Sequence, residues 1–479
     1  MAPESALARP PALARERMVA TSQPTATAAG LRMLRAGGSA ADAALAAAAV
    51  LCVTEPMSTG PGGDMFALVW RDGDAEGLDA AGPAPLGATA GAAPDEVGPR
   101  SVDVPGAVAG WAALAERHGR LGLEACLADA ISLARDGFAV GARCATSWAS
   151  CGPLPEGFAP APPCGMRVSA PELADTLEAI AREGPPAFYG GAVGAAICAS
   201  SWLEPEDLAG MRAHWVTPLR GRYGGHEILE LPPPTQGVAA LEGLALLERT
   251  PQGLGDRITC CRLALEDALR EVRDGADVAH LLEAETIERR LRERPRTIAE
   301  PAGGTVYLCA VDGDGMAVSL VQSLYYGFGS GVVAPGTGVV LQNRAACFAV
   351  GGGVEPGRRP YHTIIPGLIA RDGALLGPFG VMGGFIQAQA HLQFVHALLR
   401  DGLDPQAALD RPRFRVDDHH VRLEQGLWHA ADAVAALGLE PIRETDMAVF
   451  GGGQAIMRTR HGTLIGGSDS RKDGYAAGD

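Results

Sequence analysis

Two apolar runs on either side of a short polar turn are the feature that most restricts the folds open to this chain. Residues 305–311 and 316–320 are rich in apolar and β-branched side chains, and an Asp-Gly-Asp-Gly turn at 312–315 separates them. This composition predicts a β-hairpin. Helical patterns at 238–247 and 258–284 precede the hairpin. Hairpins without strict strand–helix alternation favour stacked antiparallel sheets with helices outside, an α+β fold.

The first half of the chain carries helix signals. Ser22 and Ser39 are each expected to cap a helix, the second helix running over 40–53. That second stretch is apolar and Ala-rich but too short to cross a bilayer, so it is interpreted as a buried helix. Residues 285–303 are charged and then interrupted by Pro and Gly, which is typical of an exposed loop or linker.

Composition excludes several function classes. The chain is 47% hydrophobic and 20% charged, which is ordinary for a globular protein. Its net charge of −16 disfavours a nucleic-acid or membrane-surface partner. The only lysine is Lys472, so a Schiff-base lysine in the body of the chain is excluded. The ten cysteines form no Cys-x-x-Cys pair and no secretory segment precedes them, which predicts a reduced, cytoplasmic protein without cofactor.

A polar cluster near the C-terminus contains residue types that can bind a metal ion. Asp417-Asp418 is followed directly by His419-His420. The spacing of these residues does not match that of known metal ligands, so a solvated turn is favoured and no metal is expected.

The segment before the hairpin offers a nucleophile. Gly303-Gly304-Thr305 joins a Gly/Pro-punctuated segment to a predicted strand. Gly304 has the backbone freedom that lets the Thr305 hydroxyl attack its own preceding carbonyl group. Cleavage between Gly304 and Thr305 would free the Thr305 α-amine, which can serve as the general base for the same residue's hydroxyl. This chemistry defines an N-terminal nucleophile hydrolase.

Many ordered motifs around this junction resemble the gamma-glutamyltransferase family, also called gamma-glutamyltranspeptidase. The hairpin, Phe-Gly-Ser-Gly at 328–331 and Leu-Gln-Asn-Arg at 341–344 resemble the start of the family's small subunit. The segments 20–24, 37–43, 60–63 and 232–235 resemble its large subunit in the same order. The resemblance covers about residues 18–470, and it is closest to the acylase and oxamate-amidohydrolase-like branch.

The resemblance implies a four-layer αββα sandwich and a set of catalytic residues. It implies self-cleavage of one precursor, a zymogen, into a large subunit of residues 1–304 and a small subunit of residues 305–479 that form one intertwined domain. A homodimer of such heterodimers also fits the family. Thr305 matches the nucleophile and Ser323 its supporting hydroxyl, while Gly383 and Gly384 match the glycines whose backbone N–H groups hold the oxyanion.

Departures from the family pattern concern the substrate. Ala81 stands where glutamyl-transferring members carry an arginine that grips the α-carboxylate, and Tyr325 and Cys347 replace the groups that hold the α-amine. His362 and Thr363 replace a serine pair. These changes predict a small-molecule amide or acyl substrate that is not glutamyl. The residues expected to line its pocket are Tyr325, Tyr326, Arg344, His362, Thr363, Phe385 and Gln387.

Several alternatives stay open at this point. The same nucleophile would also suit hydrolytic C–C cleavage, gamma-glutamyl transfer through a rebuilt pocket, or a processed but silent family member. His362 is either a substrate ligand or a core histidine with satisfied hydrogen bonds. Arg344 either binds a substrate carboxylate or holds its loop, with the loop favoured. Cys347 is interpreted as a small packed residue.

Overall fold

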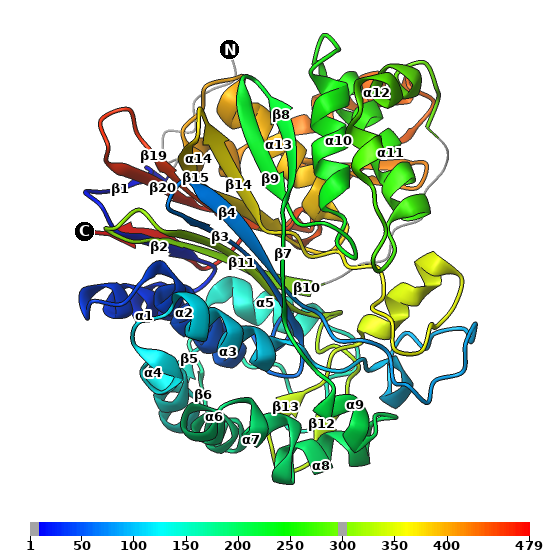
Figure 1. Ribbon diagram of the computed structural model, residues 1–479. Coiled ribbons are helices and arrows are strands. Elements are labelled where there is room, and N and C mark those ends of the chain that lie inside the picture. The colour runs from blue at the N-terminus through cyan, green and yellow to red at the C-terminus, as the bar shows by residue number, and fades with distance from the viewer. Residues whose placement is uncertain (1–8, 296–303) are drawn as a thin grey trace.

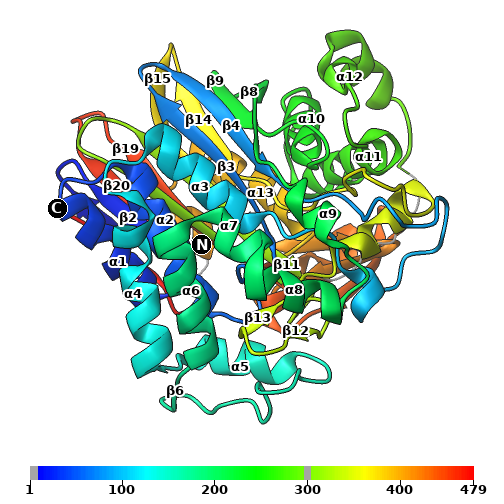
Figure 2. The same ribbon diagram turned by 60° about the horizontal axis from the view of Figure 1, so that its bottom comes forward.

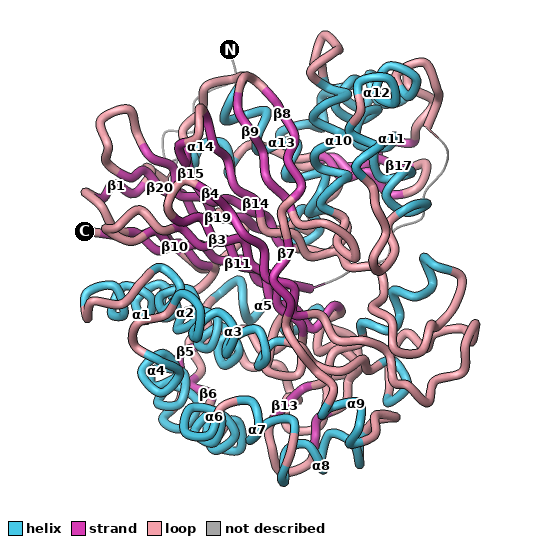
Figure 3. The backbone as a smooth tube through the Cα atoms, viewed as in Figure 1, coloured by secondary structure: helices cyan, strands magenta, loops and turns pink. Residues whose placement is uncertain are grey.

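Two stacked β-sheets with helices on both outer faces form the core of the molecule (Figure 1). The computed structural model describes residues 9–295 and 304–479. Figure 3 shows the strands gathered between two helical regions. Every strand pair inside the two large sheets is antiparallel. The expected αββα sandwich of the N-terminal nucleophile hydrolase type is confirmed.

One seven-stranded sheet contains the predicted hairpin. Its order is β21-β2-β10-β11-β3-β4-β7. The strands are β2 (Met18–Thr21), β3 (Asp64–Arg71), β4 (Asp74–Ala80), β7 (His214–Val216), β10 (Gly304–Val311), β11 (Ala317–Tyr325) and β21 (Tyr475–Gly478). The hairpin is β10–β11, and nearly all of its side chains are buried because the sheet is covered on both faces.

The second seven-stranded sheet lies against the first. Its order is β1-β20-β19-β15-β14-β9-β8. The strands are β1 (Ala12–Ala14), β8 (Leu219–Tyr223), β9 (His226–Glu230), β14 (Gly367–Arg371), β15 (Ala374–Met382), β19 (Gly452–Arg458) and β20 (Leu464–Ser468). Strand β15 packs over β10 and β11, with Tyr307 of β10 against Gly380 of β15. The start of β10 therefore faces the interior between the sheets.

Helices from the first half of the chain cover the first sheet. They are α1 (Pro24–Arg35), α2 (Ala40–Thr54), α3 (Ala107–His118), α4 (Gly122–Asp136), α5 (Ala142–Ser150), α6 (Pro171–Glu183), α7 (Pro185–Tyr189), α8 (Gly191–Ser200) and α9 (Pro205–Ala209). Figure 2 shows α4 and α6 side by side in the outer part of this layer.

The two predicted helix caps have different outcomes. Ser39 caps α2 in a capping box with Asp42, and every residue of α2 is buried, which confirms the prediction. Ser22 was wrong as a cap, because α1 begins at Pro24 and its N-cap is Gln23. Proline at the first position already sets the helical φ there.

Helices from the second half cover the other sheet. They are α10 (Gly237–Leu247), α11 (Leu254–Glu271), α12 (Ala284–Arg290), α13 (Ile386–Leu399) and α14 (Pro405–Asp410). The predicted helix over 258–284 was too long, because α11 ends at Glu271 and a turn follows. The predicted loop over 285–303 was wrong at its start, where α12 buries Ile287; residues 296–303 lie outside the described part of the chain.

Small sheets complete the fold. They pair β5 (Phe138–Ala139) with β6 (Arg167–Val168), and β12 (Val333–Ala334) with β13 (Val339–Val340). A three-stranded sheet joins β16 (Phe414–Asp417), β17 (His420–Leu423) and β18 (Glu440–Arg443), with the short helix α15 (Ala431–Ala435) beside it. In residues 9–295 and 304–479 no helix combines the length and the apolar character that a membrane span requires.

Candidate active site

A β-bulge sits at the predicted nucleophile. The β10–β11 pairing shifts register between Gly304 and Val306, so Thr305 has no direct partner across the hairpin. A bulge bends its strand and redirects a side chain, and bulges are common next to active sites. Thr305 is 2% exposed, so its hydroxyl is held inside the protein in the uncleaved chain.

Two hydroxyl groups meet at the carbonyl oxygen of Gly304. Thr305 Oγ1 donates to Gly304 O at 2.6 Å, and Ser323 Oγ donates to the same oxygen at 2.8 Å. The two hydroxyl oxygens are 3.2 Å apart. Ser323 Oγ in turn accepts the Tyr325 N–H at 2.9 Å, which fixes its position. The arrangement polarises the carbonyl group that Thr305 would attack and keeps the Thr305 hydroxyl next to it.

Arg344 lies behind the two hydroxyls and is fully buried. Its Nη2 donates to Ser323 Oγ at 3.3 Å and its Nη1 to Thr363 Oγ1 at 3.1 Å, while its guanidinium stacks over the Tyr325 ring at 4.3 Å. Within the described residues no carboxylate lies within ion-pairing distance of this guanidinium, and its Nε has no hydrogen-bond partner. A buried cation without a paired anion suits a substrate carboxylate.

His362 and Asp64 form a buried pair beside Arg344. Ile364 N–H donates to His362 Nδ1 at 3.4 Å, so His362 Nε2 carries the ring hydrogen and donates it to Asp64 Oδ2 at 3.1 Å. Burial lowers the pKa of His362 well below its ordinary value, and the charges of Arg344 and Arg359 add to the effect. The lowered pKa keeps the ring neutral, and the contacts to Ile364 N–H and Asp64 leave neither ring nitrogen for a substrate.

The second oxygen of Asp64 is held by the backbone and by a glutamine. Asp64 Oδ1 accepts hydrogen bonds from Gly82 N, Gly106 N and Gln342 Nε2 at 3.0–3.1 Å. Burial nevertheless raises the pKa of Asp64 to about 7, against the pull of Arg344 and of these donors. Asp64 pairs directly with Ser323 across β3 and β11, so it anchors the strand end that carries the second hydroxyl.

Asp103 is the least satisfied carboxyl group near this cluster. It is fully buried, and neither of its oxygens has a hydrogen-bond partner in residues 9–295 and 304–479. Burial raises its pKa well above the ordinary range, Asp64 raises it further, and Arg344 opposes both. An unpartnered buried carboxyl group destabilises the folded chain, and a ligand that donates a hydrogen bond would remove that cost.

The glycine pair predicted for the oxyanion occupies the junction between β15 and α13. Gly383 has φ +127° and Gly384 φ +71°, conformations that L side chains rarely adopt. Gln236 Nε2 donates to Gly384 O at 3.3 Å and to Thr363 O at 2.7 Å. Through Gln236 the glycine loop is tied to Thr363, which contacts Arg344.

The remaining predicted pocket residues pack around this centre. Tyr325 has φ +80°, is buried, and stacks on the half-buried Tyr326 with ring centroids 4.5 Å apart. Phe385 stacks on Tyr361 at 5.6 Å, and Gln387 Oε1 accepts the Ile365 N–H at 3.1 Å. Phe385 and Gln387 are therefore engaged inside the protein. Burial raises the pKa of the Cys347 thiol, in keeping with a packed residue.

The sequence of nearly the whole chain matches one protein family. The family model described as gamma-glutamyltranspeptidase matches residues 26–479. The chain belongs to the gamma-glutamyltranspeptidase family. The resemblance inferred from the motifs is thereby confirmed over nearly the whole chain, and so is the expectation of an enzyme of the amidohydrolase and acylase type.

Relatives within the gamma-glutamyltranspeptidase family carry different names. The chain is 29% identical to the glutathione hydrolase-like YwrD proenzyme of Bacillus subtilis, over 97% of this chain and 98% of that protein. It is 32% identical to the oxamate amidohydrolase proenzyme of Klebsiella pneumoniae, over 94% and 96%. The crystal structure of cephalosporin acylase from Bacillus halodurans superposes with a TM-score of 0.92 at 38% identity, covering 100% of this chain and 98% of that one.

Sequence reasoning missed three residues that the fold of this family member brings to the site: Asp64, Asp103 and Gln236. The signal for Asp64 was a carboxylate at the start of an apolar strand, directly after a Gly-Pro-Gly-Gly run. The signal for Asp103 was an acid between two valines. Gln236 follows Pro-Pro-Pro-Thr and had no signal of its own.

Proposed function

We propose that this chain is a precursor that cuts itself between Gly304 and Thr305 and then hydrolyses a non-glutamyl amide through an acyl-enzyme on Thr305. The observation that supports the proposal most is the meeting of the Thr305 and Ser323 hydroxyls at the Gly304 carbonyl oxygen. The product would be a large subunit of residues 1–304 and a small subunit of residues 305–479.

Self-cleavage would be an N-to-O acyl shift. Thr305 Oγ1 attacks the carbonyl carbon of Gly304, and the hydroxyl of Ser323 stabilises the negative charge that develops on the oxygen. The C–N bond breaks, the nitrogen takes up the hydroxyl proton, and an ester joins Gly304 to Thr305 Oγ1. Water hydrolyses this ester, which leaves a carboxylate on Gly304 and a free α-amine on Thr305.

Turnover would repeat the same bond changes on a substrate. The neutral α-amine of Thr305 takes the proton from its own hydroxyl as Oγ1 attacks the substrate carbonyl. The N–H groups of Gly383 and Gly384 would hold the oxyanion. The amine leaves with the proton, and water then releases the acid from the acyl-enzyme.

The proposed substrate class rests on the charged groups around Arg344. Ala81, Tyr325 and Cys347 offer no charge to the α-carboxylate and α-amine of a glutamyl group. Arg344 and Asp103 instead offer a buried cation and a buried carboxyl group, neither of which is paired within the described residues. A compact substrate with its own carboxylate and an N–H donor would satisfy both. The relatives named for oxamate and for cephalosporin support an acyl group other than glutamyl.

Denaturing electrophoresis of the wild type and of two Thr305 variants tests the nucleophile. The chain of 49.3 kDa should divide, in proportion to length, into bands of about 31 and about 18 kDa. Thr305→Ala should give only the long chain and no turnover, because both the nucleophile and the future base are lost. Thr305→Ser is the matched control and should still cleave. An uncut chain that turns over substrate would contradict the proposal.

A substrate panel tests specificity. Purified, cleaved protein is incubated with N-acyl amino acids, simple amides, oxamate and a gamma-glutamyl anilide. The glutamyl anilide should react on the order of a thousandfold more slowly than the best acyl substrate, since a site without the matching groups leaves the substrate's charges unpaired. The glutamyl compound is included because one relative is named glutathione hydrolase-like. If it is turned over in preference to the acyl substrates, the result favours gamma-glutamyl hydrolysis instead.

A further inference from the structure

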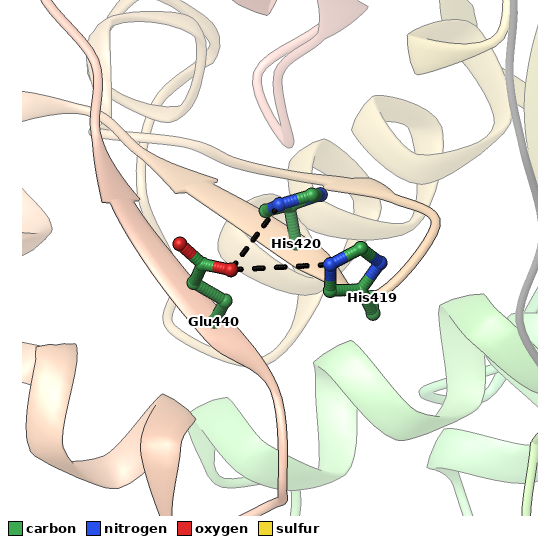
Figure 4. Close-up of side chains that lie close together, drawn as sticks. All are labelled: His419, His420 and Glu440. Carbon is green, nitrogen blue, oxygen red and sulfur yellow. Dashed lines mark ion pairs between the residues drawn. The ribbon is translucent and has the colours of Figure 1, made fainter.

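Three potential metal ligands converge on the three-stranded sheet β16–β17–β18, outside the two large sheets. His419 lies in the β16–β17 turn, His420 starts β17 and Glu440 starts β18 (Figure 4). Glu440 Oε2 lies 3.3 Å from His420 Nε2 and 3.9 Å from His419 Nε2. One ligand atom from each residue lies within 4.8 Å of the others. None of the three takes part in the contacts of Thr305.

Backbone pairing holds the three residues together. His420 and Glu440 are register partners in the parallel pair of β17 and β18, so their side chains are neighbours on one face. Glu440 N–H donates to His419 O at 2.9 Å. The cluster is thus built on paired strands. Glu440 is distant from the two histidines in sequence, so sequence spacing alone does not show that it lies beside them.

A fourth residue orients one of the imidazoles. Asp418, in the left-handed region at φ +58°, places its Oδ2 2.9 Å from His419 Nδ1. A hydrogen on Nδ1 donated to this carboxylate leaves the lone pair of Nε2 facing Glu440. Carboxylate–histidine pairs of this kind are the usual second layer of a metal site, where they fix the tautomer and raise the basicity of the ligand.

We propose that His419, His420 and Glu440 form a binding site for a divalent transition metal ion of the zinc type, with water completing the coordination. Two imidazole nitrogens and one carboxylate oxygen are ligands that Zn²⁺ accepts in tetrahedral geometry. Ligands at about 2.0–2.1 Å from zinc stand about 3.3 Å apart at the corners of a tetrahedron, the separation that His420 and Glu440 already have.

The exposure of the site allows an ion to enter and the third ligand to adjust. The His419 and Glu440 side chains are 55% and 64% exposed, and that of His420 is 29% exposed. The ligand atoms now lie up to 4.8 Å apart, so they must draw together on binding, and the exposed His419 side chain has room to move. Asp418 and His419 lie in a turn with His419 exposed, as expected from the sequence, and the proposed site adds Glu440 as a third ligand.

The position of the site indicates a stabilising role. Strand β16 is bonded to α13 through Gln389, whose side chain pairs with Val416 N and Val416 O. A bound ion would fasten the β16–β17 turn to β18 and so stiffen the layer that supports α13. We expect the ion to raise the thermal stability of the protein and to leave the chemistry at Thr305 unchanged.

The test uses full-length protein without an affinity tag, stripped with a chelator and then titrated with Co²⁺ and Zn²⁺. We expect saturation at one ion per chain, visible absorption bands of tetrahedral Co²⁺, and a higher melting temperature with Zn²⁺. His420→Ala and Glu440→Gln should remove the bands, and Asp418→Asn should weaken binding by about tenfold. His461→Ala, at an exposed histidine elsewhere, is the matched control and should bind like the wild type.

Two results would overturn the proposal. One is the absence of tetrahedral Co²⁺ bands in the wild type. The other is binding that His420→Ala and Glu440→Gln leave unchanged, which would place the ion elsewhere, for example on cysteines. Circular dichroism of each stripped variant establishes that it is folded, so a lost band reports a lost ligand.

Discussion

At the scale of the residue, two groups are candidates for the general base: the imidazole of His362 and the α-amine that Thr305 would gain on cleavage. Burial and the charges of Arg344 and Arg359 keep the pKa of His362 far below neutrality, and both ring nitrogens are engaged. In the proposed mechanism the group that must lose a proton is then the free α-amine of Thr305, and such amines titrate near 7.7–8.0 in unstructured peptides. Burial would lower that value further.

In the pH profile of kcat/KM, activity should rise along an acidic limb as the general base loses its proton. In His362→Gln this limb should remain, with its midpoint below about 7.7–8.0, because the amine and not the imidazole titrates there. The measurement is a pH–rate profile of wild type and variant on the same substrate. Loss of the limb in the variant would transfer the role of base to His362.

Asp103 should make the folded chain less stable as pH rises. Burial, with Asp64, raises its folded pKa well above the ordinary value. The folded state therefore keeps a proton that the unfolded chain loses above about pH 4, and stability falls through that window by at most about 1.4 kcal/mol per pH unit. Asp103→Asn should flatten this slope between pH 4 and 7 and unfold at a higher temperature at pH 7.

The control for this experiment is the exposed Asp432. Urea unfolding at several pH values should give the same slope for Asp432→Asn as for the wild type, since this carboxylate lies in solvent. An Asp103→Asn protein that is less stable than the wild type at pH 7 would show that Asp103 has a partner that is not visible in the described residues. Slow turnover in a more stable Asp103→Asn protein would support its contact with substrate.

At the scale of the element, the junction of β15 and α13 depends on glycine. A Cβ on Gly383 would stand 2.8 Å from Ile386 Cγ2 and 3.2 Å from Gly451 Cα, at a φ of +127°. Gly383→Ala should therefore shift the loop that is proposed to hold the oxyanion. We expect kcat to fall by about 10²–10³, the usual effect of losing one oxyanion donor.

Gly373→Ala is the matched control for the glycine loop. Gly373 also has positive φ, +75°, in the turn between β14 and β15, but a Cβ there meets no atom within 4 Å. Steady-state kinetics of the two variants separate backbone strain from damage to the loop. Equal kcat values for Gly383→Ala and the wild type would remove Gly383 from the proposed mechanism.

At the scale of the whole molecule, the two proposed subunits are interleaved. Within the first sheet β2, from residues 1–304, pairs with both β10 and β21, and β11 pairs with β3. In the second sheet β1 pairs with β20, and β9 with β14. After cleavage the two fragments should co-elute on size exclusion without denaturant and unfold in one transition, like uncleaved Thr305→Ala. Separation of the fragments under native conditions would contradict this.

Elements whose signals are local can be predicted from the sequence alone. The Asp-Gly-Asp-Gly turn and its flanking β-branched runs specify the β10–β11 hairpin, and Ser39 with Asp42 specifies the start of α2, because each depends only on neighbouring residues. The motif order also pointed to the family and to Thr305, Ser323 and the glycine pair.

The surroundings of those residues depend on how the chain packs in three dimensions. Packing ended α11 at Glu271 and formed α12, where charge and turn residues suggested a loop. Pairing of β3 with β11 placed Asp64 beside Ser323, the loop before α3 placed Asp103 near Arg344, and pairing of β17 with β18 placed Glu440 beside His420. These contacts join residues far apart in sequence, and for Asp64, Asp103 and Arg344 their energies arise from burial and desolvation, which exist only once the chain has packed.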